Sequence, residues 1–253
     1  MTAPARWHAS SWRWATTRLR SPGAILTICL IACQTVASPV RAQVAASVSI
    51  ESDYRYRGYS LSDRRPAAIA QLGYDHTSGL YANIAAIAAF GRDGDVYFLG
   101  AQGNAGYVKR LNPRLYLDSG VSHSEYDPIA PDRRDWRYTE FYLGLGTDQI
   151  TARVSYSPHY FIADTETIYT EVEGALEPGE NWRLNAHAGA LFYLSSPYFI
   201  PHDTYYDWRL GVSRRFGHFD VHAALSGGGP GKDYYGSTPH SRTAVTVGAS
   251  WSL

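Results

Sequence analysis

Cysteine is scarce in this chain, and a long apolar run is absent. The only cysteines among the 253 residues are Cys29 and Cys33, so residues 34–253 cannot form a disulfide framework. The longest apolar stretch covers residues 24–37 and has three polar interruptions, whereas a membrane-spanning helix needs about 20 apolar residues. These absences exclude a disulfide-stapled secreted domain and a helical membrane protein.

The first 42 residues have the order of a secretory signal peptide. Four arginines and no acidic residue precede the apolar stretch: Arg6, Arg13, Arg18 and Arg20. Residues 39–42, Pro-Val-Arg-Ala, follow it and end on a small residue, which predicts cleavage after Ala42. The mature protein would then comprise residues 43–253. A second interpretation is open, because residues 30–33, Leu-Ile-Ala-Cys, resemble a bacterial lipobox in which Cys33 carries a lipid.

A surplus of basic residues is also absent from the expected mature chain. The first 42 positions carry five arginines and no acidic residue, so residues 43–253 have 18 basic and 23 acidic residues and a formal charge of −5. A nucleic-acid partner favours a basic surface. We therefore expect no nucleic-acid partner.

Polar and apolar residues alternate along the start of the expected mature chain. Between positions 46 and 57 the even residues are Ala46, Val48, Ile50, Ser52, Tyr54 and Tyr56, and the odd residues are Ser47, Ser49, Glu51, Asp53, Arg55 and Arg57. Alternation with a period of two indicates a strand whose two faces lie in different environments. This stretch is longer than the usual soluble strand of about 5–6 residues. It suits a tilted strand with lipid on one side and a polar interior on the other.

Similar alternation recurs along the chain and predicts twelve strands. They cover residues 45–57, 66–75, 79–90, 95–109, 113–126, 136–146, 149–161, 166–177, 181–194, 204–216, 218–226 and 241–253. Tight turns alternate with connections that are mostly longer, as in outer-membrane barrels with tight periplasmic turns. The predicted fold is therefore all-β: a closed antiparallel transmembrane β-barrel of about 12 strands, formed by residues 43–253.

The last predicted strand resembles a recognition signal for barrel assembly. Val245, Val247, Ala249, Trp251 and Leu253 share one face. Bacterial outer-membrane barrels commonly end on an apolar residue that the assembly machinery reads. A terminal phenylalanine is the usual form, and Leu253 departs from it.

Residues 52–66 resemble the opening of the TorF-type porin family, outer-membrane proteins once described as a family of unknown function. That family begins with a Ser-Asp-Tyr-Arg-aromatic-Arg-Gly run, followed by Ser-x-Ser and a proline. The matching residues are Ser52, Asp53, Tyr54, Arg55, Tyr56, Arg57, Gly58, Ser60, Ser62 and Pro66. Residues 78–81, Ser-Gly-Leu-Tyr, resemble its next turn and strand. The resemblance implies an outer-membrane barrel and brings no catalytic residues.

Charged residues of both signs fall on the predicted inner face. The candidate pore-lining residues are Glu51, Asp53, Arg55, Arg57, Glu140, Arg153, Glu171, Glu173, Arg183, His187, Arg209, Asp220 and Arg242. Eight strands leave an interior that side chains fill and 16–18 leave an aqueous channel, so twelve predict a narrow, partly blocked lumen. The charges either frame a polar path with a transverse field or form a salt-bridge network that neutralises buried charge. Both interpretations are compatible.

Two motifs invite assignment to a metal site or a hydrolase. His218 and His222 flank Asp220, but residues four apart on a strand are separated by roughly 13 Å, too far for one zinc ion. In residues 122–125, Ser-His-Ser-Glu, alternation puts His123 on the face opposite both serines, so these neighbours cannot form a triad. We expect no metal, no cofactor and no enzymatic activity.

Aromatic residues are expected to form girdles at the two membrane interfaces. They are Tyr54, Tyr56, Tyr160, Trp182, Phe192, Trp208 and Trp251. Two further aromatic pairs, residues 198–199 and 234–235, fall in predicted long outer loops, where they would serve surface recognition or a loop plug.

The sequence thus predicts a porin of the Gram-negative outer membrane. Small hydrophilic solutes would diffuse passively through a narrow charged lumen. The alternative is a non-conducting barrel with an adhesion or envelope-structural role, and a barrel lipid hydrolase ranks third. The expected partners are outer-membrane lipids, the barrel assembly machinery and the solutes.

Overall fold

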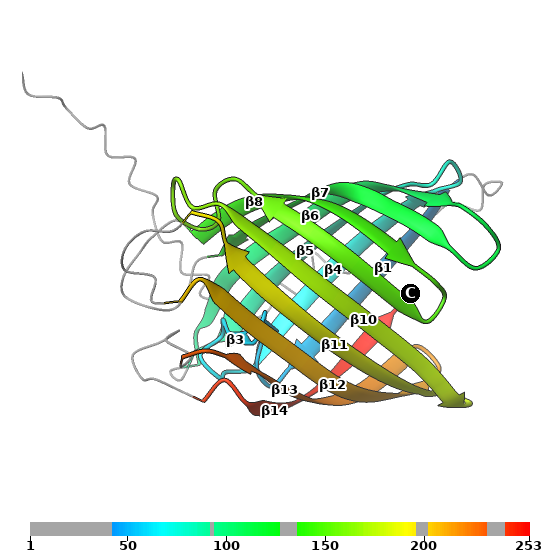
Figure 1. Ribbon diagram of the computed structural model, residues 1–253. Coiled ribbons are helices and arrows are strands. Elements are labelled where there is room, and N and C mark those ends of the chain that lie inside the picture. The colour runs from blue at the N-terminus through cyan, green and yellow to red at the C-terminus, as the bar shows by residue number, and fades with distance from the viewer. Residues whose placement is uncertain (1–41, 92–93, 127–135, 196–201, 232–240) are drawn as a thin grey trace, which may run out of the picture. The chain divides into compact units, whose positions relative to one another are not determined.

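The computed structural model describes residues 42–91, 94–126, 136–195, 202–231 and 241–253. These residues form a closed antiparallel barrel of twelve tilted strands (Figure 1). The predicted signal peptide, the lipobox and the aromatic pairs at 198–199 and 234–235 lie outside the described residues. Among the described residues, no helix has the length and hydropathy to cross a bilayer.

The twelve barrel strands agree with the twelve predicted ones. They are β1 (Ala42–Glu51), β4 (Ala67–His76), β5 (Leu80–Phe90), β6 (Val96–Arg110), β7 (Tyr116–Tyr126), β8 (Trp136–Gly146), β9 (Ile150–Ser157), β10 (Thr167–Gly179), β11 (Trp182–Tyr193), β12 (Thr204–Phe216), β13 (Phe219–Gly229) and β14 (Ala244–Ser252). Two further strands of two residues each, β2 (Arg55–Tyr56) and β3 (Tyr59–Ser60), pair only with each other.

The first and last barrel strands close the ring, as predicted. β1 pairs antiparallel with β14, with Val48 opposite Trp251 and Ile50 opposite Ala249. Its other edge pairs with β4 along its whole length. Closure leaves no unpaired strand edge in the membrane, where unsatisfied backbone groups are costly.

The outward face of the barrel is apolar on most of its strands. Large exposed side chains include Val48, Ile84, Leu143, Val154, Val172, Leu210 and Val247. In water such a continuous apolar surface would drive association. It matches the apolar band that a transmembrane barrel presents to lipid.

The sequence prediction places the end of the first strand too late. β1 ends at Glu51, and not at residue 57. Beyond it, residues 52–66, which we call the inward segment, leave the barrel wall and carry the β2–β3 hairpin. Figure 1 shows β3 at the opposite end of the barrel from the C-terminus. Gly58 has a φ of +76°, which lets the chain reverse between the two short strands.

Tyr54, Tyr56 and Tyr160 are consequently not part of an interfacial girdle. The Tyr54 hydroxyl donates to the Gln102 side-chain oxygen at 3.2 Å, and the Tyr56 hydroxyl accepts a hydrogen bond from Tyr138. Tyr160 is buried in the same aromatic cluster. These three aromatic side chains pack inside the barrel instead of facing lipid. Trp182, Phe192 and Trp251 do lie exposed on the outward face near strand ends, and Trp208 covers Gly227 of the adjacent strand.

Candidate functional site

The interior of the barrel contains two polar cavities. One has a volume of about 930 Å³ and reaches the inward segment at residues 53–58. The other has a volume of about 710 Å³ and reaches the tight turns at residues 147–149 and at Asn181. Glu173, Arg209 and His222 line both cavities. A polar space therefore extends from the inward segment to the tight-turn end.

The structure brings most of the predicted pore-lining residues to the inner wall. Those on strands that line a cavity are Glu51, Glu140, Arg153, Glu171, Glu173, Arg183, His187, Arg209 and Asp220. Asp53, Arg55 and Arg57 also lie inside the barrel, but on the inward segment and not on a wall strand as predicted. Arg242 precedes β14, is 3% exposed and contacts the inward segment.

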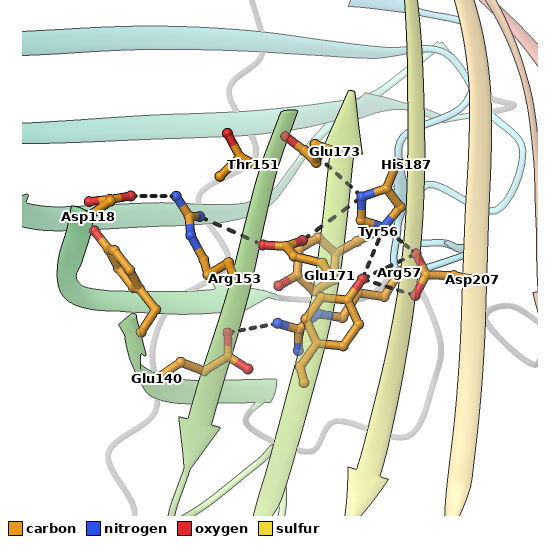
Figure 2. Close-up of polar contacts among 12 residues, drawn as sticks. Tyr56, Arg57, Asp118, Glu140, Thr151, Arg153, Glu171, Glu173, His187 and Asp207 are labelled. Carbon is orange, nitrogen blue, oxygen red and sulfur yellow. Dashed lines mark hydrogen bonds and ion pairs between the residues drawn. The ribbon is translucent and has the colours of Figure 1, made fainter. Parts of the chain in front are cut away.

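Acidic and basic side chains from five strands form a chain that spans the wall from β7 to β12, with β8 contributing none of its members (Figure 2). Its contacts are Asp118 to Arg153 at 2.8 Å, Arg153 to Glu171 at 3.7 Å, His187 to Glu171 at 3.9 Å, His187 to Glu173 at 3.4 Å and His187 to Asp207 at 2.8 Å. Each acidic member contacts a basic one. This arrangement offsets part of the negative charge in the wall and leaves Glu173, whose side chain is 58% exposed, open to the lumen.

Tyr169 connects this chain to the inward segment. Its hydroxyl donates to Asp207 Oδ2 at 3.0 Å and lies 3.1 Å from His187 Nε2. The centre of its ring lies 3.7 Å from the Arg57 guanidinium carbon, within the range of a cation–π interaction. Tyr169 and Asp118 are absent from the pore-lining prediction. Their positions on the alternating inner faces of β10 and β7 were the signal for them.

A second ion pair crosses the seam where the barrel closes. His222 Nε2 on β13 lies 2.8 Å from Glu51 Oε1 on β1, across the intervening strand β14. Gly248 of β14 lies between them, and a side chain there would collide with both. The absence of a Cβ at this position lets the two charges meet.

Arg57 is enclosed by a carboxylate and several aromatic rings in the lumen. Its guanidinium donates to Glu140 Oε2 at 2.8 Å, and both side chains are less than a tenth exposed. The rings of Tyr56, Tyr138 and Tyr160 surround it at 5.1 to 5.8 Å. Burial raises the pKa of the Tyr56 phenol well above its usual value, so this ring stays neutral.

The two motifs that were considered as a metal site and a hydrolase site do not form such sites in the structure. His218 Nδ1 contacts the Ser252 carbonyl at 2.9 Å, whereas His222 contacts Glu51, so the two histidines have different partners. Ser122 and Ser124 face the lumen, and His123 contacts Thr139 at 2.9 Å on the outward face. Glu171, Glu173 and His187 do place three potential ligand atoms within 4.8 Å of one another. Arg153 and Asp207 already contact two of these residues.

Two solved porin structures share the architecture of this chain. The KdgM porin matches with a TM-score of 0.50 and 11% identity, over 83% of this chain and 99% of its own. The NanC porin matches with a TM-score of 0.54 and 8% identity, over 83% of this chain and 100% of its own. At such low identity the likeness establishes the fold. No curated protein matches the sequence.

The closed twelve-strand barrel and its apolar outward face place the protein in the bacterial outer membrane. A family profile matches residues 33–227 and therefore includes the opening motif at 52–66. The chain belongs to that family, the bacterial proteins of unknown function described as Gcw_chp.

Proposed function

We propose that the barrel lets small hydrophilic solutes diffuse passively across the outer membrane, without a cofactor and without catalysis. The observation that supports this proposal is the polar space inside the wall, about 930 Å³ and 710 Å³ in two adjoining parts. Charged side chains of both signs line it, which favours hydrated polar solutes over apolar ones. This function also agrees with the resemblance of residues 52–66 to TorF-type porins. Recognition of the last strand by the assembly machinery stays a prediction.

A second function is a non-conducting barrel that acts in adhesion or envelope structure. The observation that favours it is the buried cluster around the inward segment, where Leu61, Tyr126 and Tyr138 are each 3% exposed. Such packing leaves little free space at this level of the lumen.

Single-channel recording separates the two functions. The protein would be refolded, inserted into a planar bilayer and recorded at moderate salt. Passive diffusion predicts discrete, weakly voltage-dependent current steps. A correctly folded protein that gives no current steps would contradict it and would favour the non-conducting barrel.

Ion selectivity tests the role of the lumenal carboxylates. We expect Glu171→Gln combined with Glu173→Gln to shift the reversal potential toward anion selectivity, because Arg153 and His187 lose negative partners. The fold should persist, since Asp118 still contacts Arg153 and Asp207 still contacts His187. Charges in a narrow lumen are weakly screened, so moderate salt suffices.

The matched control is Glu125→Gln. Glu125 is exposed on β7, on the face opposite lumenal Ser124. This substitution therefore removes one negative charge without changing the lumen. An equal shift per charge removed in this control would show that the measurement reports surface charge instead of lumenal charge.

A further inference from the structure

We propose that the inward segment, residues 52–66, is a plug that sets the size limit for solutes, and that Arg57 is the positioning residue that holds it in place; this inference rests on the proposed function.

The attachments of the inward segment lie on opposite sides of the barrel. On one side Arg57 contacts Glu140 of β8 and the ring of Tyr169 of β10. On the other side the Arg242 guanidinium, just before β14, donates to the Arg57 carbonyl at 3.1 Å and lies 4.0 Å from the centre of the Tyr59 ring. β8 and β14 are six places apart in the ring of twelve strands. The segment therefore crosses the lumen from wall to wall.

The segment is also built as a separate unit. Its two short strands pair only with each other, and the Leu61 amide donates to the Tyr54 carbonyl at 2.8 Å. Asp53 accepts from Ser62 at 3.1 Å and from Arg55 at 2.9 Å. The barrel ladder continues beside it, because Glu51 and Ala67 are register partners. Residues 53–65 can thus change position without breaking the wall, while Ser52 and Pro66 keep their backbone hydrogen bonds to Val247 and Phe90.

Backbone strain shows that surrounding contacts hold the segment in this conformation. Arg57, Asp63 and Arg64 have φ values of 46°, 55° and 55°, in the left-handed region that side chains other than glycine disfavour. Strained residues persist only where neighbouring contacts determine them, and they concentrate at clamps and switch regions. Arg57 is both strained and ion-paired, so its side chain is the natural fastening point.

The contacts that hold the Arg57 guanidinium have a specific geometry. Arg57 combines one carboxylate partner with several aromatic faces, an environment that suits a planar guanidinium better than an ammonium group. Its Nη1 and the Glu140 Oε1 have no hydrogen-bond partner among the described residues, although both are buried. The contact is therefore specific in geometry and incompletely satisfied, which fits a fastening that holds and can release.

The decisive experiment removes the plug and keeps the barrel. Residues 53–65 would be replaced by a two-residue Asn-Gly turn, because the register of Glu51 and Ala67 allows a tight hairpin between β1 and β4. Conductance in planar bilayers and entry of sugars of increasing size into proteoliposomes would be compared with the unaltered protein. We expect a several-fold higher conductance and entry of larger sugars.

Point variants test the fastening separately. Arg57→Ala should raise conductance in the same direction, and Arg57→Lys should restore part of the block because it keeps the charge. The matched control is Arg114→Ala, which removes an exposed arginine from the tight turn between β6 and β7, outside both lumenal cavities, and should leave the size limit unchanged. Heat-dependent mobility on gels would verify that each variant is folded. If the turn replacement does not fold, an unchanged size limit in folded Arg57→Ala overturns the proposal.

The outcomes separate this inference from the proposed function. A silent unaltered protein and a conducting replacement would support the plug and reject diffusion through the resting barrel. Equal, measurable conductances and equal size limits would overturn the plug alone. Two silent, folded proteins would overturn both.

Discussion

Val154→Arg should greatly reduce assembly of the barrel, at a cost of about 2–4 kcal/mol for a cation near the lipid midplane. Val154 lies on β9, is 48% exposed and points outward, between Ala152 and Tyr156 on the same face. An arginine there would place its charge in lipid, where no partner is available. Folding yield in lipid vesicles and denaturant titration of the folded fraction would measure the loss.

Two variants on the same strand provide the controls. Val154→Leu keeps an apolar side chain toward lipid and should fold normally. Thr151→Arg puts the same charge on the lumenal face, where it lines the 710 Å³ cavity and remains hydrated. If Thr151→Arg were the damaging variant and Val154→Arg the tolerated one, the face assignment of β9 would be inverted, because a shift of one residue exchanges the faces.

The structure revises one expectation for the neighbouring residue. Alternation places Arg153 on the polar inner face of its strand, so Arg153→Ala would be expected to be tolerated. Arg153 instead contacts Asp118, whose side chain is 7% exposed. Removing the Arg153 side chain leaves the Asp118 carboxylate with a neutral partner, the Tyr81 hydroxyl at 2.7 Å. We therefore expect a measurable loss of stability, smaller than for Val154→Arg because Arg153 is one-third exposed.

The strands were predictable because each barrel strand separates lipid from a polar interior over its whole length. Along β9, Ile150 and Val154 lie outward while Arg153 lies inward, and the period of two is visible in the letters. Closure followed from the cost of an unpaired strand edge in the membrane, and an even number of strands lets the first and last strands pair antiparallel. The predicted end of β9 was too late, because Tyr160 continues the alternation after the wall strand has ended.

The inward segment was not predictable from the same pattern. Tyr54 and Tyr56 alternate with Asp53 and Arg55 as they would in a wall strand, and alternation does not reveal whether an aromatic side chain meets lipid or another ring. The turn signal at Gly58 was present in the sequence. The turn brings Arg57 to Glu140, which lies 83 positions after Arg57 in the chain.

The charge chain shows the same limit for the lumen. The inner-face residues follow from alternation, but their pairing depends on how neighbouring strands are staggered. Arg153 is the register partner of Glu171 across β9 and β10, yet its shortest ion pair is to Asp118, two strands away on β7. A long arginine side chain can reach past the adjacent strand. The spacing of residues along the chain therefore did not indicate the contact between Arg153 and Asp118.

Gly189→Val should destabilise the barrel by about 1–3 kcal/mol, the usual cost of inserting extra atoms into a packed site. Gly189 faces inward on β11, and the Tyr169 ring lies directly over it. A Cβ at this position would lie 2.6 Å from the Tyr169 Cζ atom and closer still to its hydroxyl oxygen, so the ring must move. Tyr169 is 2% exposed, so its ring can move only by giving up packed contacts.

Displacement of the Tyr169 ring would affect the lumen as well as the stability of the barrel. Tyr169 would lose its hydrogen bond to Asp207 and its contact with the Arg57 guanidinium. Ala188→Val, at the adjacent exposed position whose side chain points outward, adds the same bulk toward lipid and should be nearly neutral. Combining Gly189→Val with Tyr169→Ala should cost less than the sum of the two single changes, because the collision disappears. Strict additivity in denaturant titrations would contradict the contact between the ring and the glycine.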